Sequence, residues 1–542
     1  MSVTSTQVLV VGGGPVGMMV ARTLGHFGVE CMLVERNETT TTHPKMDITN
    51  ARSMELFRRV GLADGLRAVA VPDGNPFDVS WITTLTGHEL HRFVYPGADG
   101  ARQQIAEQND GSQPSEPPMR VSQVLIEPVL LEAIEGHPSV AVHFGCAFES
   151  LENTGDGVLA TLRTSAGQLK TVHARYLVAC DGGGSLVRKQ LDISLSGQAR
   201  VSQRFITHFR SDARDLLQRW GKAWHYQSNR GTLVAQNDVD TWTLLSRFPE
   251  NTEPEDINPS QLISDFVGKD IDHEVLVANA WTPHLLVADR YRDGNVFLAG
   301  DSAHQYIPTG GYGMNTGIGD AFDIAWKLAA VLHGWGGKTL LDAYENERQP
   351  VGIANCRGAA RHNAVRVKIA ELYSPLLGDE GPDADAERHR VGAEIARIGN
   401  AENECVGLEL GYIYADSPVI CHDGDHEFSD DPRIYRPTTT PGARLPSVIL
   451  SSGENIYQRL GQWFTLLCTQ PCETSGFEQV AAAHKLPLSV VDISNERVAG
   501  VYRTPAILVR PDHHVAWRGH PDMTTETIEQ VIRRVSGQIW PQ

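Results

Sequence analysis

The sequence predicts an α/β fold, α+β over the whole chain, in which a mainly β domain interrupts a discontinuous α/β domain. Three observations support this. The hydrophobic pattern of residues 7–35 predicts a buried strand, a glycine-rich turn, a helix and a second strand. Residues 196–281 are strand-like and aromatic. Buried-strand composition then returns at 296–299, before an apolar helical stripe over 320–332, so the first domain resumes after an insertion.

Composition excludes several classes of protein. Lys and Arg total 47 against 66 Asp and Glu, a net charge of -19, which argues against nucleic acid and anionic membranes as partners. No stretch approaches the ~20 apolar residues of a membrane helix, and no basic residue precedes Arg22, as a signal or transit peptide would require. The eight cysteines form no C-x-x-C pair. We therefore expect a cytoplasmic protein without a disulfide framework or metal site.

The first glycines form a dinucleotide-binding motif. Gly12-x-Gly14-x-x-Gly17 directly follows a strand, with Pro15 in the first helical turn and Glu35 at the end of the next strand. Glycine lets the backbone approach a pyrophosphate, and the helix dipole stabilises its charge. A carboxylate accepts hydrogen bonds from ribose hydroxyls. This context favours a Rossmann-like unit over a simple tight turn.

Two later segments contain further motifs of the kind that surround a bound dinucleotide. Residues 176–188 run from a strand into Asp181-Gly182 and a helix, and residues 294–316 contain Asp301 before a glycine-rich turn. With the first motif, they resemble the single-component FAD-dependent aromatic hydroxylases of the para-hydroxybenzoate hydroxylase fold. The branch that the chain resembles contains the phenol, 2-hydroxybiphenyl and 2,4-dichlorophenol monooxygenases. The C-terminal part resembles the thioredoxin-like domain of that branch.

The resemblance implies an FAD site. The residues that would hold the pyrophosphate are Gly12, Gly14, Pro15 and Gly17. Glu35 would bind the adenosine ribose, and its neighbour Arg36 would also bind the cofactor. Arg52 would lie near the phosphates. Without the resemblance, each glycine could serve a turn.

The resemblance also places residues around the flavin ring. Gln123 would stand beside the flavin, Asp181 and Gly182 would serve both FAD and the nicotinamide donor, and Asp301 would bind the ribityl chain. The backbone just before a helix N-terminus would face the pyrimidine edge and stabilise negative charge there; its residues are Gly313, Met314 and Asn315. Helix caps are the alternative for both aspartates.

The implied activity is hydroxylation of a phenolic ring by NADPH or NADH and O2 through a flavin hydroperoxide. Two alternatives stay open: a polyketide-tailoring flavin oxygenase acting on a polycyclic phenol or quinone, and a flavin-binding ligand or redox sensor without turnover. Sequence does not name the phenol or choose between the nucleotides. The family is usually homodimeric, so a homodimer is expected.

Three residues are candidates for contact with the substrate. Asp47, at the end of the segment 44–47, would accept the phenolic proton, directly or through water, or would merely hold its loop. Lys45 departs from the arginine usual in that branch. Trp224 would pack on the substrate ring, although core packing explains it equally well, and Pro308 would contact the substrate. His304 is expected to be structural, and no metal site is predicted.

The expected domains follow from these motifs. They are an FAD-binding domain (1–75, 119–195 and 285–375), a substrate-binding domain (76–118 and 196–284), a helical linker (376–440) and a thioredoxin-like domain (441–542). Residues 98–118 are expected to form a long mobile loop. Cys468 and Cys472 are four apart, which predicts a structural or dimer-supporting tail rather than disulfide exchange. His513 and His514 are expected at the surface.

Overall fold

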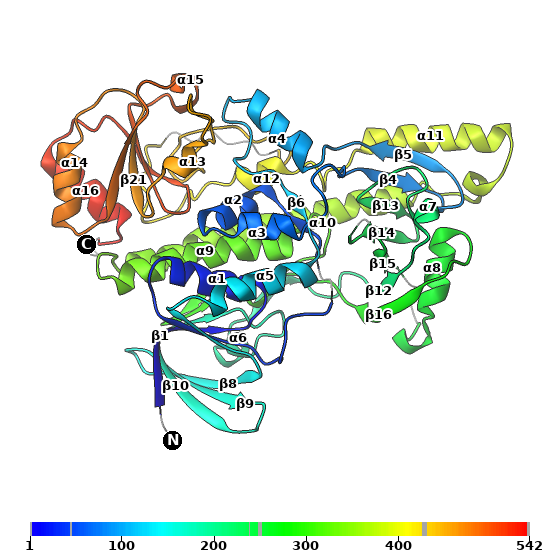
Figure 1. The fold of residues 1–542 in the computed structure, drawn as a ribbon, viewed down its shortest axis with the longest axis horizontal. Helices are drawn as coiled ribbons and strands as arrows, with labels where there is room; N and C mark the ends of the chain where they lie inside the picture. Colours follow the sequence, from blue (N-terminus) through cyan, green and yellow to red (C-terminus); the bar gives the residue numbers. More distant parts are fainter. Residues whose placement is uncertain (1–2, 44–45, 238, 248–251, 425–430, 539–542) are drawn as a thin grey trace.

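The computed structural model describes residues 3–43, 46–237, 239–247, 252–424 and 431–538. It contains two large sheets and a smaller C-terminal sheet, each accompanied by helices, and the two chain ends lie on different units (Figure 1). In the part of the chain that the structure describes, no helix combines the length and the apolar composition that crossing a bilayer requires.

The first sheet joins strands from distant parts of the chain. Its main path has the order β18-β19-β10-β1-β2-β7, and the β8–β9 hairpin extends from β10. The bounds are β1 (Val3–Val11), β2 (Cys31–Val34), β7 (Val140–His143), β8 (Cys146–Asn153), β9 (Val158–Thr164), β10 (Leu169–Ala179), β18 (Arg292–Asp293) and β19 (Val296–Leu298). β19, β10, β1, β2 and β7 are parallel and β1 is central, so the predicted α/β fold is confirmed.

Helices pack against this sheet and against one another. α9 contacts α1, α2 and α10, and α1 also contacts α5 (Figure 1). The bounds are α1 (Pro15–His26), α2 (Ala51–Arg59), α3 (Ala63–Ala68), α5 (Gln123–Glu135), α6 (Leu186–Gln190), α9 (Tyr312–Leu332) and α10 (Thr339–Ala370). α9 begins at Tyr312, earlier than the predicted stripe, because Gly310 and Gly311 with φ of 91° and 66° end the preceding turn there.

The second sheet forms the wall of the functional site. Its order is β16-β12-β15-β14-β13-β4-β5, so strands from 76–118 and 196–284 share one sheet. The bounds are β4 (Val79–Ile82), β5 (Glu89–Phe93), β12 (Arg204–Arg210), β13 (His225–Ser228), β14 (Gly231–Ala235), β15 (Thr241–Ser246) and β16 (Glu274–Trp281). One face packs on α8 (Pro259–Val267) in a separate hydrophobic core, and α11 (Pro382–Ile398) covers β5.

Smaller elements complete the N-terminal part. Two small sheets, β3-β6 and β11-β17-β20, contain β3 (Ile48–Thr49), β6 (Met119–Arg120), β11 (Leu195–Gln198), β17 (Leu285–Ala288) and β20 (His304–Gln305). The remaining helices are α4 (Ala98–Glu107), α7 (Arg214–Leu217), α12 (Val406–Leu410) and the short 3-10 turns Pro254–Asp256, Gly300–Ser302 and Pro375–Gly378. The mobile loop expected over 98–118 is therefore wrong for its first half, which is helical.

The C-terminal unit is a four-stranded sheet of order β22-β21-β23-β24. Its elements are α13 (Ile456–Arg459), β21 (Phe464–Cys468), α14 (Ser475–Ala483), β22 (Leu488–Asp492), α15 (Ala499–Tyr502), β23 (Ala506–Val509), β24 (Val515–Gly519) and α16 (Thr525–Val535). His513 and His514 are 1% and 0% exposed, so their predicted surface position is wrong. They lie in the β23–β24 turn, which packs against the rest of the protein and stacks them on Tyr457 and Tyr414.

Buried ion pairs attach this unit to the helices below it. Arg510 donates to Glu347 at 2.6 and 2.8 Å and to Asp323 at 3.1 Å. Arg444 donates to both oxygens of Glu55 on α2. Removing one partner of a buried pair leaves an uncompensated charge and typically costs about 3–5 kcal/mol. The C-terminal unit is therefore tightly docked on α2, α9 and α10.

Candidate functional site

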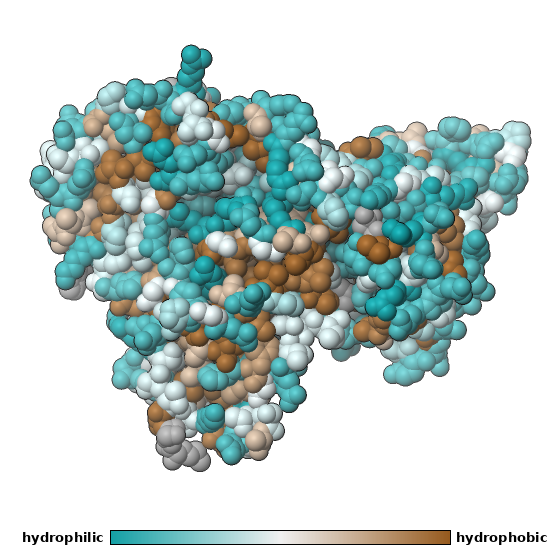
Figure 2. All heavy atoms as spheres, in the orientation of Figure 1, coloured by the Kyte–Doolittle hydropathy of each residue, from teal (hydrophilic) through white to brown (hydrophobic). Residues whose placement is uncertain are grey.

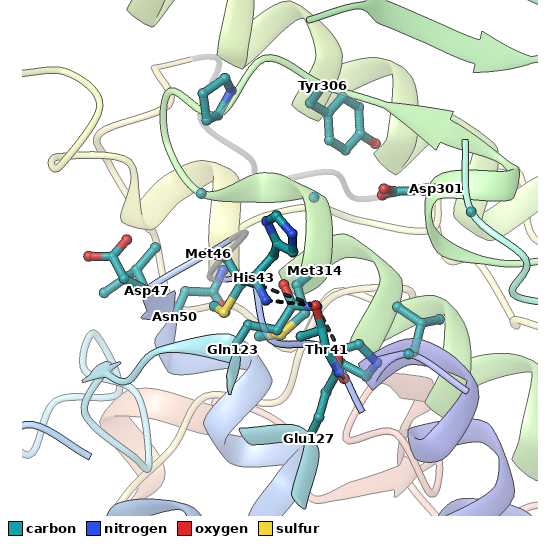
Figure 3. A pocket seen from close by; sticks show the side chains of 18 of the residues that line it. Thr41, His43, Met46, Asp47, Asn50, Gln123, Glu127, Asp301, Tyr306 and Met314 are labelled. Atoms are coloured by element: carbon teal, nitrogen blue, oxygen red, sulfur yellow. Dashed lines mark hydrogen bonds between the residues drawn. The ribbon is translucent and has the colours of Figure 1, made fainter. Parts of the chain in front are cut away.

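One large cavity connects the first sheet to the second. Its volume is about 1650 Å³, and its walls include the glycine-rich turn after β1, the start of α9 and one face of the second sheet. Figure 3 shows Thr41, Gln123 and Met314 on one side, with Asp301 and Tyr306 across from them. Sites in open α/β sheets lie beyond the carboxyl ends of the strands, as this one does.

The glycine-rich turn forms an open cradle. Gly12 has φ of 111°, and a Cβ there would lie 2.2 Å from the Cys180 carbonyl oxygen. Gly17 does not line the cavity; its role is packing, since a Cβ would lie 1.9 Å from the Gly12 carbonyl oxygen. Gly14 and Pro15 line the cavity, with no atom within 4 Å of a Gly14 Cβ and no side chain capping α1. The uncapped helix N-terminus suits an anionic pyrophosphate.

Glu35 and Arg36 line the same end of the cavity. The Glu35 carboxylate accepts from the Gly13 backbone N–H at 2.7 Å and from the Asn37 backbone N–H at 2.9 Å. These bonds fix the carboxylate beside the cradle, where ribose hydroxyls could donate to it.

Asp181 caps a helix and also lies at the cavity, where the predicted contact with the cofactor stays a prediction. Its Oδ2 accepts from the backbone N–H groups of Leu186 and Val187 at 2.8 and 3.2 Å, so it caps α6, and it also lines the cavity beside Gly182. Asp301 lines the cavity near Gly313, where a Cβ would lie 3.9 Å from the aspartate Oδ1.

The start of α9 borders the cavity. Gly313 and Met314 line it. The sequence predicts them just before a helix N-terminus, but they lie within the first turn of α9. Asn315 does not line the cavity. Its Oδ1 accepts from the Asn50 N–H at 3.0 Å and its Nδ2 donates to the Ile48 carbonyl at 3.1 Å, so it positions the segment that carries Asp47.

Gln123 lines the cavity from the start of α5. Its Nε2 donates to Glu127 Oε1 at 2.7 Å, and the other oxygen of Glu127 accepts from the Thr41 N–H at 2.7 Å (Figure 3). This chain of bonds holds the segment around Thr41 against α5. Pro44 and Lys45 lie outside the described residues. The effect of lysine in place of the usual arginine at position 45 therefore stays a prediction.

Arg52 lies away from the cavity. Its guanidinium donates to Glu55 at 3.0 Å and to the Asp512 carbonyl at 2.5 Å, because the carboxylate and the docked C-terminal unit surround it. This position does not support the contact with FAD phosphates that the resemblance implies.

Asp47 lines the cavity and accepts a hydrogen bond from the indole N–H of Trp224, which also lines it. Burial raises the pKa of the Asp47 carboxyl, while the Trp224 hydrogen bond and the charges of Arg120 and Arg366 oppose that rise. Trp224 thus combines an edge that orients Asp47 with a ring that borders the cavity. The sequence predicts a role for the ring only.

The second sheet presents one face to the cavity, because successive side chains alternate between faces. The residues of this sheet that line the cavity alternate along their strands, except at Ala280; they are Ile206, His208, His225, Thr232, Val234, Thr243, Leu245, Val277, Asn279, Ala280 and Trp281. Pro308 lines the cavity next to this wall. The surface mixes apolar groups with hydrogen-bonding groups, as expected for an aromatic ligand with polar substituents.

The predicted linker contributes residues that the sequence analysis missed. Glu402, Asn403 and Glu409 line the cavity, and Glu402 pairs bidentately with Arg366 of α10. Burial raises the pKa of Glu409 to about 7. No local motif marks these residues; only the proximity of the linker to α10 brings them to the site.

Two polar clusters have ordinary structural explanations. His304 Nε2 bonds Asp320 Oδ2 at 2.7 Å in full burial, as expected for a structural histidine. Asp323, Glu347 and Asp512 lie close enough to hold a metal ion. Lys327 and Arg510 already pair with this group, so its charge is compensated within the chain.

These residues fit FAD. The open space beside Gly14, the uncapped α1 and the fixed Glu35 carboxylate suit its adenosine diphosphate half. The N-terminal end of α9 suits a flavin ring that carries negative charge when reduced.

Comparison with known proteins supports this fit. A family model described as "FAD binding domain" matches residues 5–359, and one described as "Aromatic-ring hydroxylase, C-terminal" matches residues 438–538. The chain is 36% identical to the FAD-dependent monooxygenase apdD of Emericella nidulans, over 99% of this chain and 91% of that protein. Other relatives include phenol and dichlorophenol monooxygenases and polyketide hydroxylases.

Solved structures of known proteins are also similar to this chain. RebC, soaked with chromopyrrolic acid and holding 7-carboxy-K252c, superposes with a TM-score of 0.89 at 32% identity, covering 99% of this chain and 100% of RebC. The flavin-dependent monooxygenase PieE, in complex with FAD and substrate, gives a TM-score of 0.89 at 29% identity, covering 99% of each chain.

Proposed function

Because this chain belongs to the FAD-dependent aromatic-ring hydroxylases, we propose that it hydroxylates a phenolic ring of a multi-ring aromatic substrate. The chain is an FAD-dependent monooxygenase that uses NAD(P)H as reductant. The size of the cavity supports a large substrate. Pockets for a single ligand measure about 300–1,000 Å³, and this cavity measures about 1650 Å³. Even with a dinucleotide at the upper limit, several hundred Å³ would remain.

Bound FAD supplies electrons from NAD(P)H and activates O2 at the flavin ring. The residues of the chain then act on the phenol. Asp47 accepts the phenolic proton, directly or through water, and raises the nucleophilicity of the ring. Trp224 orients the accepting carboxylate. One oxygen atom enters a ring C–H bond to give C–OH, and the other leaves as water.

The first test is turnover by the purified holoenzyme. NADPH and NADH oxidation are followed with single-ring phenols and with phenols of three or four fused rings, and product masses are determined. We expect stimulated oxidation and a product heavier by one oxygen atom with the multi-ring phenols. Products from single-ring phenols alone would contradict the proposed size class, and binding of FAD without stimulation by any phenol would favour a sensor.

Trp224→Phe tests the role of the indole N–H. The hydrogen bond opposes the rise in the pKa of Asp47, so its loss is expected to raise that pKa further. Because the carboxylate is the active form, the acidic limb of the kcat/KM profile should move to higher pH, with more activity lost near pH 6 than near pH 8. Trp242→Phe is the control, since that indole N–H bonds the Ser211 carbonyl instead. An unmoved limb would contradict this role.

A homodimer and a cytoplasmic location also remain proposals, and the family resemblance supports the homodimer. Sedimentation of the full chain is expected to give the mass of two copies, twice 59.4 kDa. A mass of 59.4 kDa at micromolar concentration would rule the homodimer out.

A further inference from the structure

The cavity-facing side of the second sheet ends in two arginines. Ile206 of β12 and Leu245 of β15 are directly opposed, and both line the large cavity. Arg204 begins β12 two positions before Ile206, so its side chain shares the face of Ile206. Arg247 directly follows the end of β15, and both arginines line one small cavity at this end of the sheet. The wall therefore changes from apolar to cationic at this end.

The two arginines repel each other, because like charges that lie close together raise the free energy of both. The pKa of Arg204 is lowered to about 10 by burial and by the charges of Arg247 and Arg366. Arg366 is neutralised by Glu402. Within the described ranges no carboxylate pairs with Arg204 or Arg247; Arg204 makes one long hydrogen bond, 3.4 Å, to Asn363.

A second cavity of about 50 Å³ lies at these arginines. Arg204, Arg247 and Arg366 all line it. It shares six wall residues with the large cavity: Thr232, Leu245, Trp281, Ile307, Pro308 and Arg366. A water needs roughly 10–15 Å³ of such space, so a group of a few heavy atoms fits. The small cavity thus extends the sheet-lined end of the site.

We propose that Arg204 and Arg247 bind an oxyanion, a carboxylate carried by the aromatic substrate. The guanidinium fork binds planar carboxylates bidentately, and an anion between the two side chains would remove their repulsion. This inference rests on the proposed function, since it takes the sheet-lined end as the place of the substrate. A phosphate of NAD(P)H is the other source of the same chemistry, and the test separates the two.

The test titrates the holoenzyme with 6-hydroxy-2-naphthoate and with 2-naphthol, following the flavin absorbance. We expect the carboxylate to bind about tenfold tighter or more, as hydrogen bonds to charged groups allow. In the double variant Arg204→Gln, Arg247→Gln, this ratio should fall to about one, with the affinity for 2-naphthol unchanged. Arg230→Gln is the control, to be compared with each single variant, Arg204→Gln and Arg247→Gln: it removes one positive charge at the same end of the sheet, outside the small cavity.

The outcomes are separable. An unchanged ratio in the double variant would overturn the proposal. A loss of NADPH or NADH affinity, with the naphthoate ratio unchanged, would assign the oxyanion to the nucleotide and overturn the substrate carboxylate. Binding does not require turnover, so a holoenzyme that shows the ratio but oxidises no phenol would contradict only the proposed function. The double variant should melt no lower than wild type, because it removes the two charges that repel each other.

Discussion

Asp47→Asn is expected to lower the rate of hydroxylation by a factor of about 10²–10⁴, the usual contribution of a positioned general base. Asparagine keeps the shape of the side chain and can still accept from the Trp224 indole N–H, but it does not take up a proton at pH 7. FAD content should be unchanged, because Asp47 faces the substrate wall through Trp224 rather than the glycine cradle. The measurement is product formed per NAD(P)H oxidised, together with the single-turnover rate of hydroxylation.

The control for this variant is Asp99→Asn, which makes the same change on α4 at a side chain that is 66% exposed. It should behave as wild type. Wild-type coupling and rate in Asp47→Asn would eliminate Asp47 as the base. Loss of FAD from the variant would instead give Asp47 a structural role.

Gly17→Ala is expected to destabilise the whole FAD-binding region. Its Cβ would lie 1.9 Å from the Gly12 carbonyl oxygen and 3.3 Å from Cys180 Cβ, so α1 must move away from β1 and β10. Overpacking in a core typically costs about 1–3 kcal/mol, and overlap with backbone belongs at the upper end. The melting temperature of the apoprotein and the FAD-to-protein absorbance ratio should both fall.

Gly14→Ala separates cofactor binding from folding. Gly14 has φ of -74°, which alanine adopts readily, and no atom lies within 4 Å of its Cβ. The apoprotein should melt as wild type does, while the added methyl group, at the mouth of the cradle, should weaken FAD binding about tenfold or more, or at least 1.4 kcal/mol. If Gly17→Ala kept its stability while Gly14→Ala lost it, the assigned roles of the two glycines would be reversed and the packing argument wrong.

The sequence predicts those residues of the candidate site whose positions depend on local backbone geometry. Gly12 and Glu35 belong to one strand–turn–helix–strand unit, so their spacing and context mark them, whereas the role of Asp181 follows from the family resemblance. Asp47 and Trp224 were each proposed for the site, but their hydrogen bond joins residues 177 positions apart. Such a contact depends on how the two sheets face each other, and spacing does not encode it.

Contacts between distant parts of the chain also explain which residues the sequence predicted wrongly or did not mark. Arg52 and His513 are polar residues whose neighbours come from the other end of the chain, so neither their burial nor their contact could be anticipated from local pattern. Glu402 and Glu409 belong to a stretch that has the composition of a linker, yet folding places it against α10 and the cavity. The cationic end of the sheet forms because β12 and β15 are neighbours, which brings Arg204 and Arg247 to one cavity, and local sequence does not show which strands pair.

The buried ion pairs beneath the C-terminal unit also bear on how the protein is made. Glu55 and Glu347 leave the ribosome long before Arg444 and Arg510, which add to the pairing that Arg52 and Lys327 already give them. Until those arginines emerge, closing α2, α9 and α10 into their final packing would bury carboxylates that lack one of their two cations, which costs free energy. The nascent chain is therefore expected to hold this region open until synthesis is nearly complete, and to capture its flavin only after release.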